Sequence, residues 1–159
     1  MKALPVAKAP KQKRDAEETR RSAKALAHLV VAAKDVSLAH KKGVLHYVIW
    51  KITEAEHVKH KLPLRSRKAH EEVLRGGNLG KRLRHEHVFP RKELVEHLLK
   101  RGADVSKLLD TRAIACVVTV EEAKKLNKKN GEGWLRYDDI PVVLIEKNGN
   151  ARRYYPKNP

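Results

Sequence analysis

Apolar residues in the first half of the chain recur at the spacing of helices. From Asp15 onward they lie three and four positions apart, which marks one face of a helix. That face is made of Leu26, Leu29, Val30 and Ala33. Gly43 breaks this pattern, and a second helix is predicted from residue 44 to residue 56. Its apolar face is made of Leu45, Val48, Ile49 and Ile52.

A third helix is predicted between a capping residue and a pair of glycines. Ser66 can accept a hydrogen bond from the first turn of a helix that extends through Leu74. Gly76 and Gly77 would end that helix, because glycine readily adopts the backbone conformation that closes a helix. Residues 78–81 are then predicted to form a turn.

Two strands and two further helices are predicted in the second half of the chain. Residues 83–88 form the first strand, and residues 91–101 form a helix. The core face of that helix is made of Leu94, Val95, Leu98 and Leu99. The apolar run 113–118 forms the second strand, and Thr119 caps the helix that follows.

The C-terminal region has the pattern of a β-hairpin. Two runs with strand character, residues 141–146 and 151–155, flank the turn 147–150. This turn contains Asn148-Gly149, and Asn-Gly is the strongest short signal for a hairpin. The sequence therefore predicts an α+β fold with a helical N-terminal half, a central strand-strand-helix element and a closing hairpin.

The pattern also predicts the domain organisation. Residues 1–14 contain two prolines and five basic residues without periodicity, which is typical of a flexible basic arm. Residues 15–159 are predicted to form a single domain. Its helical part covers residues 15–75, and its strand-strand-helix core with the hairpin covers residues 82–155.

The charge of the chain points to a polyanionic partner. With 36 lysines and arginines against 19 acidic residues, the net charge is +17 and the isoelectric point is about 10.1. A charge of this size favours nucleic acid as the partner, with an anionic membrane surface as the alternative. No run approaches the roughly 20 apolar residues of a membrane-spanning helix.

Cysteine usage and the N-terminus add information about the compartment. Cys116 is the only cysteine, so the chain cannot form a disulfide framework or a thiolate zinc site, and it is predicted to be a core residue. The N-terminus is basic but lacks the apolar segment of a secretory signal. We expect a cytoplasmic protein of a bacterial cell, encoded by the bacterium or by a phage.

Candidate chemistry is concentrated in the run from Arg82 to Pro90. Glu86 could hold a divalent ion on a phosphate oxygen, and His87 beside it could take a proton from an attacking water. An imidazole with an unperturbed pKa near ~6.5 can accept a proton at neutral pH. Residues 86–90 consist of a glutamate, a histidine, a β-branched residue, any residue and a proline. This run resembles the one that begins the active site of the HNH (ββα-metal) nucleases.

Residues 84–137 as a whole resemble a group of small bacterial and phage HNH-like proteins. The resemblance rests on the run His85-Glu86-His87, on Thr119-Val120-Glu121-Glu122 at a helix start, and on the later segment 133–137, Gly-Trp-Leu-Arg-Tyr. It implies a ββα-metal element and a metal-dependent nuclease. His87 would be the base, and Glu86 with Glu122 or Glu121 would hold Mg²⁺ or a similar ion. Arg84 and Arg91 would steady the phosphate and its developing charge.

The sequence departs from the HNH pattern at two points. The closing helix has Ala123 where the family has a metal-binding histidine, and the middle asparagine has no counterpart. Either the site uses carboxylates instead, or catalysis has been lost and binding has been kept. A regular strand also points His85 and His87 to one face and Glu86 to the other, where Glu86 could pair with an arginine such as Arg82 or Arg84.

Basic residues surround the histidine motif. Residues 57–101 contain thirteen lysines and arginines against five acidic residues. The residues predicted to contact nucleic acid are Arg82, Arg84, Arg91, Lys92, Arg152 and Arg153. Double-stranded DNA is the expected partner, although RNA also fits this charge.

Three functions remain open on the sequence. The first is a metal-dependent endonuclease of the HNH type. The second is a non-catalytic nucleic-acid-binding accessory protein on a degenerate HNH scaffold. The third is a basic inhibitor that binds an acidic protein partner.

Overall fold

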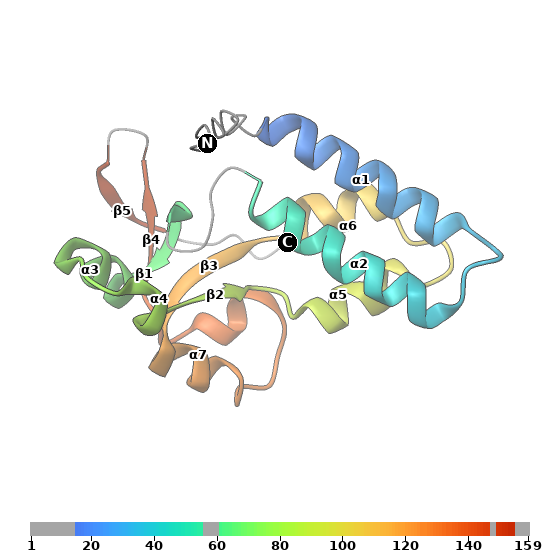
Figure 1. The fold of residues 1–159 in the computed structure, drawn as a ribbon. Helices are drawn as coiled ribbons and strands as arrows, with labels where there is room; N and C mark the ends of the chain where they lie inside the picture. The colour runs from blue at the N-terminus through green and yellow to red at the C-terminus, as the bar shows by residue number, and fades with distance from the viewer. Residues whose placement is uncertain (1–14, 56–60, 147–148, 155–159) are drawn as a thin grey trace, which may run out of the picture.

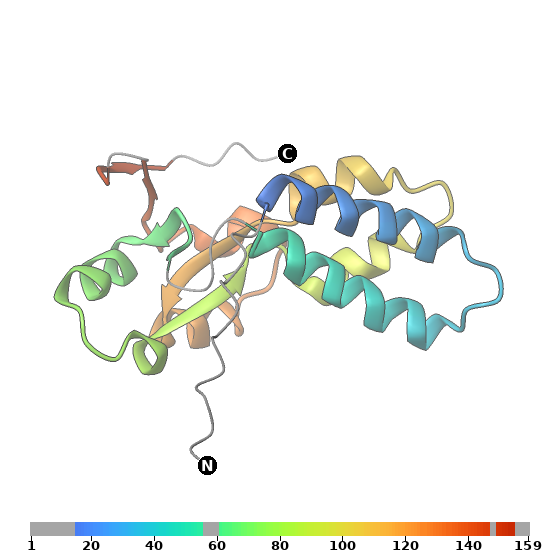
Figure 2. The ribbon, with the colours of Figure 1, turned by 45° about the horizontal axis from the view of Figure 1, so that its top comes forward.

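The computed structural model describes residues 15–55, 61–146 and 149–154 and shows an α+β fold (Figure 1). A group of helices forms one part of the molecule, and a mixed sheet with its own helices forms the other (Figure 2). The helical group consists of α1 (Ala16–Ala32), α2 (Leu38–Thr53), α5 (Arg91–Leu98) and α6 (Val105–Arg112). No helix in the described part of the chain combines the length and apolar character needed to cross a membrane.

Side-chain caps start the two N-terminal helices. Asp15 accepts hydrogen bonds from the first turn of α1, and Ser37 accepts one from the amide of His40 at the start of α2. The predicted break at Gly43 is wrong, because Gly43 lies inside α2 and the chain turns at residues 33–37 instead.

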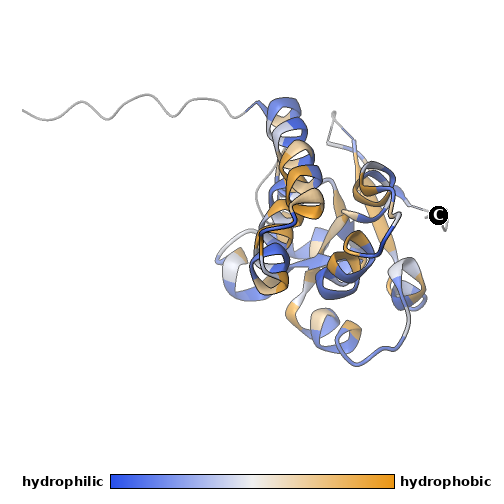
Figure 3. Ribbon diagram, turned by 90° about the vertical axis from the view of Figure 1, so that its right-hand side faces the viewer, coloured by the Kyte–Doolittle hydropathy of each residue, from blue (hydrophilic) through white to orange (hydrophobic). Residues whose placement is uncertain are grey.

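The predicted core face of α1 is also partly wrong. Ala23 and Ala27 are buried against the other helices, whereas Leu29 is 70% exposed. Small side chains let α1 approach α2 closely, so the contact face is rotated away from the leucines. Apolar residues gather on the inner faces of the helices and on the strands, and polar residues cover the outside (Figure 3).

The sheet has five strands in the order β2-β3-β1-β4-β5. Their bounds are Leu64–Ser66 for β1, Leu83–His87 for β2, Ala115–Thr119 for β3, Val142–Ile145 for β4 and Ala151–Arg153 for β5. β1 runs parallel to β3, and all other pairs are antiparallel. β2 is therefore an edge strand, paired on one side with β3 and far from the hairpin β4–β5.

Helices cover both faces of the sheet. α7 (Val120–Leu126) and the 3-10 helix η2 (Gly133–Tyr137) pack on one face, in a cluster that includes Val88, Cys116 and Trp134. α3 (Arg67–Arg75) packs on the other face against Leu83 and Val117. Cys116 is fully buried, as its apolar neighbours predicted.

Most predicted elements of the second half are present. The helix capped by Ser66 ends at Gly76, which has a positive φ of 73°, and the strands near residues 83 and 115 and the C-terminal hairpin are found. Residues 79–82 form the short helix α4 (Leu79–Arg82) instead of a turn, and β1, α6 and η2 were not predicted. The predicted arm 1–14 and the end of the hairpin at residue 155 lie outside the described residues.

Candidate functional site

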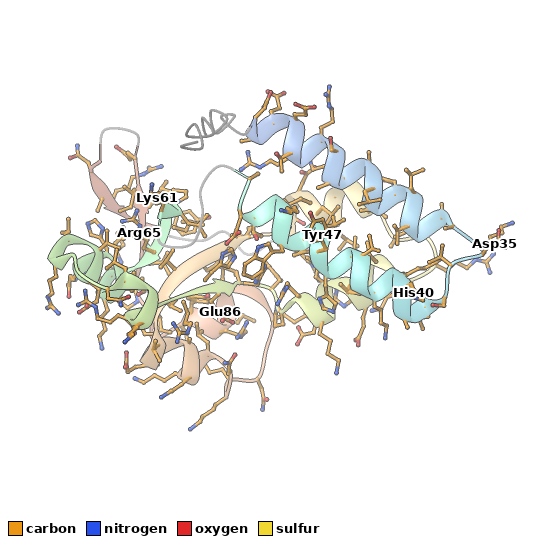
Figure 4. The ribbon with its side chains drawn as sticks, viewed as in Figure 1. Asp35, His40, Tyr47, Lys61, Arg65 and Glu86 are labelled. Carbon is orange, nitrogen blue, oxygen red and sulfur yellow. The ribbon has the colours of Figure 1, made fainter. Side chains whose placement is uncertain are left out.

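A cleft of about 620 Å³ lies along the edge strand β2, where it meets α2, α5 and the end of α7. Because the outer edge of β2 has no neighbouring strand, side chains from both faces of the strand reach this one cleft. Its polar lining comprises His46, His85, Glu86, His87, Arg91, Lys92, Glu93, Asn127, Lys129, Asn130 and Arg136. Glu86 is at the end of β2 that leads toward α5 (Figure 4).

Three aromatic rings form a cluster on one face of β2. The rings of Trp50 and His85 are stacked, with centroids 4.9 Å apart and an interplanar angle of 13°. The ring of His87 contacts both, with its centroid 4.8 Å from that of His85 and 5.8 Å from that of Trp50. The alternation of a strand places both histidines on this face, as the sequence predicted, while α2 supplies the tryptophan.

The two histidines differ in their hydrogen-bond partners. Nδ1 of His85 lies 3.3 Å from Oε1 of Glu54, an ion-pair contact, but neither ring nitrogen has a hydrogen-bond partner among the described residues. The side chain of His85 is only 3% exposed, so these nitrogens have no access to bulk water. His87 instead has a partner for its Nε2, the hydroxyl of Thr53 at 3.4 Å.

Burial keeps both imidazoles neutral. It is the main cause that lowers the pKa of His85, against the opposing effect of Glu54. For His87, burial together with the nearby His85, Arg91 and His46 lowers the pKa to about 3. A neutral imidazole has one N–H donor and one acceptor nitrogen. Each ring can therefore donate a hydrogen bond to a bound molecule or accept one from it.

Glu86 points to the opposite face of β2 and meets Arg136. Nη2 of Arg136 lies 3.2 Å from Oε1 of Glu86. Burial raises the pKa of Glu86, and the hydrogen bond and charge of Arg136 oppose that shift. The sequence had suggested Arg82 or Arg84 as the arginine for Glu86, and the structure assigns the pairing to η2 instead.

Arg91 and Lys92 are the predicted basic residues that the fold brings to the cleft. The guanidinium of Arg91 lies over the ring of Trp50, 5.2 Å from its centroid. Lys129 also lines the cleft and pairs with Asp138 and Asp139. The cleft therefore combines neutral imidazoles with several cations.

The other predicted basic residues lie elsewhere. Arg82 pairs with Glu72, and Arg84 donates to the carbonyls of Gly80 and Leu83, away from the cleft lining. Arg152 pairs with Glu146 on the far hairpin, where Arg153 also lies. Of these four, Arg84 alone lies near the histidine cluster, because it lines a smaller neighbouring pocket with Trp50 and His85.

Glu122, a predicted metal ligand, holds two helix starts together. Its Oε2 accepts hydrogen bonds from the hydroxyl of Ser66 at 2.5 Å and from the amide of Thr119 at 2.9 Å. Ser66 caps α3, and Thr119 forms a capping box with Glu122 at the start of α7. The neighbouring Glu121 is exposed on the first turn of α7.

The described residues do not fit a divalent ion at Glu86. The carboxylate of Glu86 is occupied by Arg136, that of Glu122 by Ser66 and Thr119, and Ala123 offers no ligand atom. Within residues 15–55, 61–146 and 149–154, no three His, Cys, Asp or Glu side chains are grouped to hold a metal.

We expect Glu122→Ala to lower the free energy of unfolding by about 1–3 kcal/mol, because the Ser66 hydroxyl and the Thr119 amide lose their buried acceptor. Chemical denaturation measures this change. The exposed Glu121→Ala is the matched control and should have little effect. Equal effects of the two substitutions would contradict the structural role of Glu122.

Sequence reasoning missed Trp50 and Arg136 as cleft residues and Glu54 as the carboxylate beside His85. Trp50 was included only in a predicted helix, and Arg136 only in the segment 133–137. No local signal connects Arg136 with Glu86, which lies 50 positions earlier in the chain. Trp50 could have been singled out more easily than Arg136, because the chain has only two tryptophans.

Comparisons with protein-family models, with curated proteins and with solved structures give no match for this chain. The function must therefore be argued from the cleft and from the charge of the chain.

Proposed function

We propose that this protein binds nucleic acid and that the cleft along β2 receives a phosphate of the backbone. The observation that supports this most directly is the juxtaposition of Arg91 and Lys92 with the two buried imidazoles of His85 and His87. A phosphodiester oxygen accepts hydrogen bonds from such cations and from an imidazole N–H. The net charge of +17 supplies the long-range attraction for a polyanion.

The unpartnered ring nitrogens of His85 support a bound molecule in this place. A buried polar atom without a hydrogen bond carries a cost of desolvation, which a ligand can remove by supplying the partner. The ring of Trp50 contacts both the His85 ring and the guanidinium of Arg91, so the imidazole and the guanidinium are positioned together. Double-stranded DNA is the first substrate to test, with RNA as the comparison.

Affinity for duplex DNA should fall on the order of a hundredfold between about 50 and 200 mM salt, because lysines and arginines displace condensed counterions. Fluorescence anisotropy at several salt concentrations measures this slope. Arg91→Met should lower affinity and reduce the slope by about one. Arg152→Met on the distant hairpin is the matched control and should change both less.

A flat salt response would remove the nucleic-acid proposal. Salt-resistant binding to an acidic protein, together with no affinity for DNA or RNA, would favour the inhibitor function instead.

A second candidate function is hydrolysis of the phosphodiester by an HNH-like ββα element. It is favoured by the order β2, antiparallel β3 and α7, with α7 packed against both strands. α5 and α6 are inserted between the two strands. In this function water attacks phosphorus, the bond to the leaving oxygen breaks, and neutral His87 accepts the proton of the water.

Plasmid nicking separates the two functions. Supercoiled DNA is incubated with the protein in Mg²⁺, Mn²⁺, Ni²⁺ or EDTA, beside a gel shift at the same salt. Nicking that requires an added ion supports the nuclease function. It would also show that a metal takes part, although the described residues alone do not accommodate one. A gel shift without nicking in every condition supports the binding function.

A further inference from the structure

We propose that the guanidinium of Arg136, and not a divalent ion, is the cation that Glu86 binds, so that the cleft takes up phosphodiesters without a metal. The second part of this inference rests on the proposed nucleic-acid binding. The first part concerns the chain alone and can be tested without DNA.

Arg136 connects the end of β2 with the end of α7. Nη2 donates to Glu86 at 3.2 Å and to the carbonyl of Leu126 at 3.1 Å. Nη1 donates to the carbonyls of His87 and Val88 at 3.3 and 3.4 Å. The residue is 4% exposed, so its charge is held by these four acceptors and not by water.

The oxygen atoms that bind Arg136 are the same types of ligand that a hard metal ion uses. Mg²⁺ and Ca²⁺ are bound in proteins by carboxylate and carbonyl oxygens, and here one carboxylate and three carbonyls already surround a cation. A second cation beside Glu86 would be repelled by the buried guanidinium. For an ion to take its place, Arg136 would have to leave, and the carbonyls of His87, Val88 and Leu126 would each lose the hydrogen bond from its guanidinium.

The arrangement also explains how a chain with Ala123 in its closing helix keeps an ordered cleft. Nη2 donates to the carbonyl of Leu126 at the C-terminal end of α7, which also accepts a hydrogen bond from the amide of Lys129, and a positive charge is favourable at this end of a helix. Arg136 thereby fixes α7 against β2, which carries His85 and His87. It acts as a positioning residue, and its ion pair neutralises the negative charge of Glu86 at the cleft.

A metal titration tests the first part of the inference. Mn²⁺ alone is titrated into the full chain by calorimetry, with Glu86→Gln beside the wild type and Glu121→Gln as the matched control. We expect no saturable Mn²⁺ binding that depends on Glu86. One bound Mn²⁺ in the wild type that disappears in Glu86→Gln and remains in Glu121→Gln would overturn the proposal.

Ala123→His sharpens the same test by supplying the imidazole that the closing helix lacks. While Arg136 holds Glu86, this substitution should leave Mn²⁺ binding at the wild-type level. Circular dichroism verifies that the variant is folded. A gain of stoichiometric Mn²⁺ binding would show that the site lacks only a ligand and that Arg136 does not exclude the ion.

DNA binding at constant ionic strength tests the second part. Affinities in Mg²⁺ and in EDTA should agree within about twofold, and a loss of about tenfold or more in EDTA would overturn metal-free binding. Absence of DNA and RNA binding in both buffers would end the proposed function. The Mn²⁺ titration would still decide whether Arg136 replaces the ion.

Discussion

Arg136→Met should lower the free energy of unfolding by about 3–5 kcal/mol, the range for breaking a buried ion pair by removing one partner. The substitution leaves Glu86 without its cation and removes the donor for the carbonyls of His87, Val88 and Leu126. Methionine retains the unbranched apolar part of the arginine side chain, so most of its packing contacts are kept and mainly the guanidinium is lost. For a chain of this size the melting temperature should fall by roughly 10 °C.

Urea denaturation followed by circular dichroism measures this effect. Arg84→Met is the matched control, because Arg84 also starts from the β2 region but donates only to nearby carbonyls at the surface. Adding Glu86→Gln to Arg136→Met should restore part of the stability, since the unpaired carboxylate is then removed. A loss of stability no greater than that of Arg84→Met would contradict the central role of Arg136.

If the chain hydrolyses phosphodiesters, His87→Ala should lower the rate by about 10²- to 10⁴-fold, the usual effect of losing a general base. The pKa of His87, lowered to about 3, leaves the ring neutral at pH 7 but makes it a weak base, so the rate should depend on how far the negative charge of a bound phosphodiester raises that pKa. Single-turnover cleavage of a labelled duplex measures the rate. The circular dichroism spectrum should remain near that of the wild type, and DNA affinity should fall by far less than the rate.

His28→Ala, on α1 outside the cleft lining, is the control for this experiment. It should leave the cleavage rate unchanged. Equal rates for His87→Ala and the wild type would exclude His87 as the base. No cleavage by the wild type with any divalent ion would end the enzyme hypothesis and leave the binding function in place.

Local signals in the sequence were sufficient for most helix and strand positions. The starts at Ser66 and Thr119 depend on hydrogen bonds within three residues, and the end at Gly76 depends on a backbone conformation that glycine favours. Such interactions are complete within a short segment. The core face of α1 could not be predicted in the same way, because it depends on how closely α2 approaches.

In the candidate site too, contacts between residues close in sequence were predicted, and contacts between distant residues were not. Alternation along β2 predicted that His85 and His87 share one face and that Glu86 faces away, and Arg91 and Lys92 follow closely enough to reach the same cleft. Glu122 was predicted correctly as a helix-start residue. Its carboxylate also accepts a hydrogen bond from Ser66, 56 positions earlier in the chain. This contact gives Glu122 a structural role, whereas the sequence suggested a metal ligand.

The sequence by itself determined the caps, the alternation along β2 and the strong positive charge, because these depend on residue type and short spacing. Only the tertiary structure decided what each side chain meets. It placed Trp50 of α2 on His85 and Arg136 of η2 on Glu86, across separations along the chain that no periodic pattern encodes. The free energy of a buried charge depends on its actual neighbours, so the chemistry available at Glu86 was fixed when the chain folded.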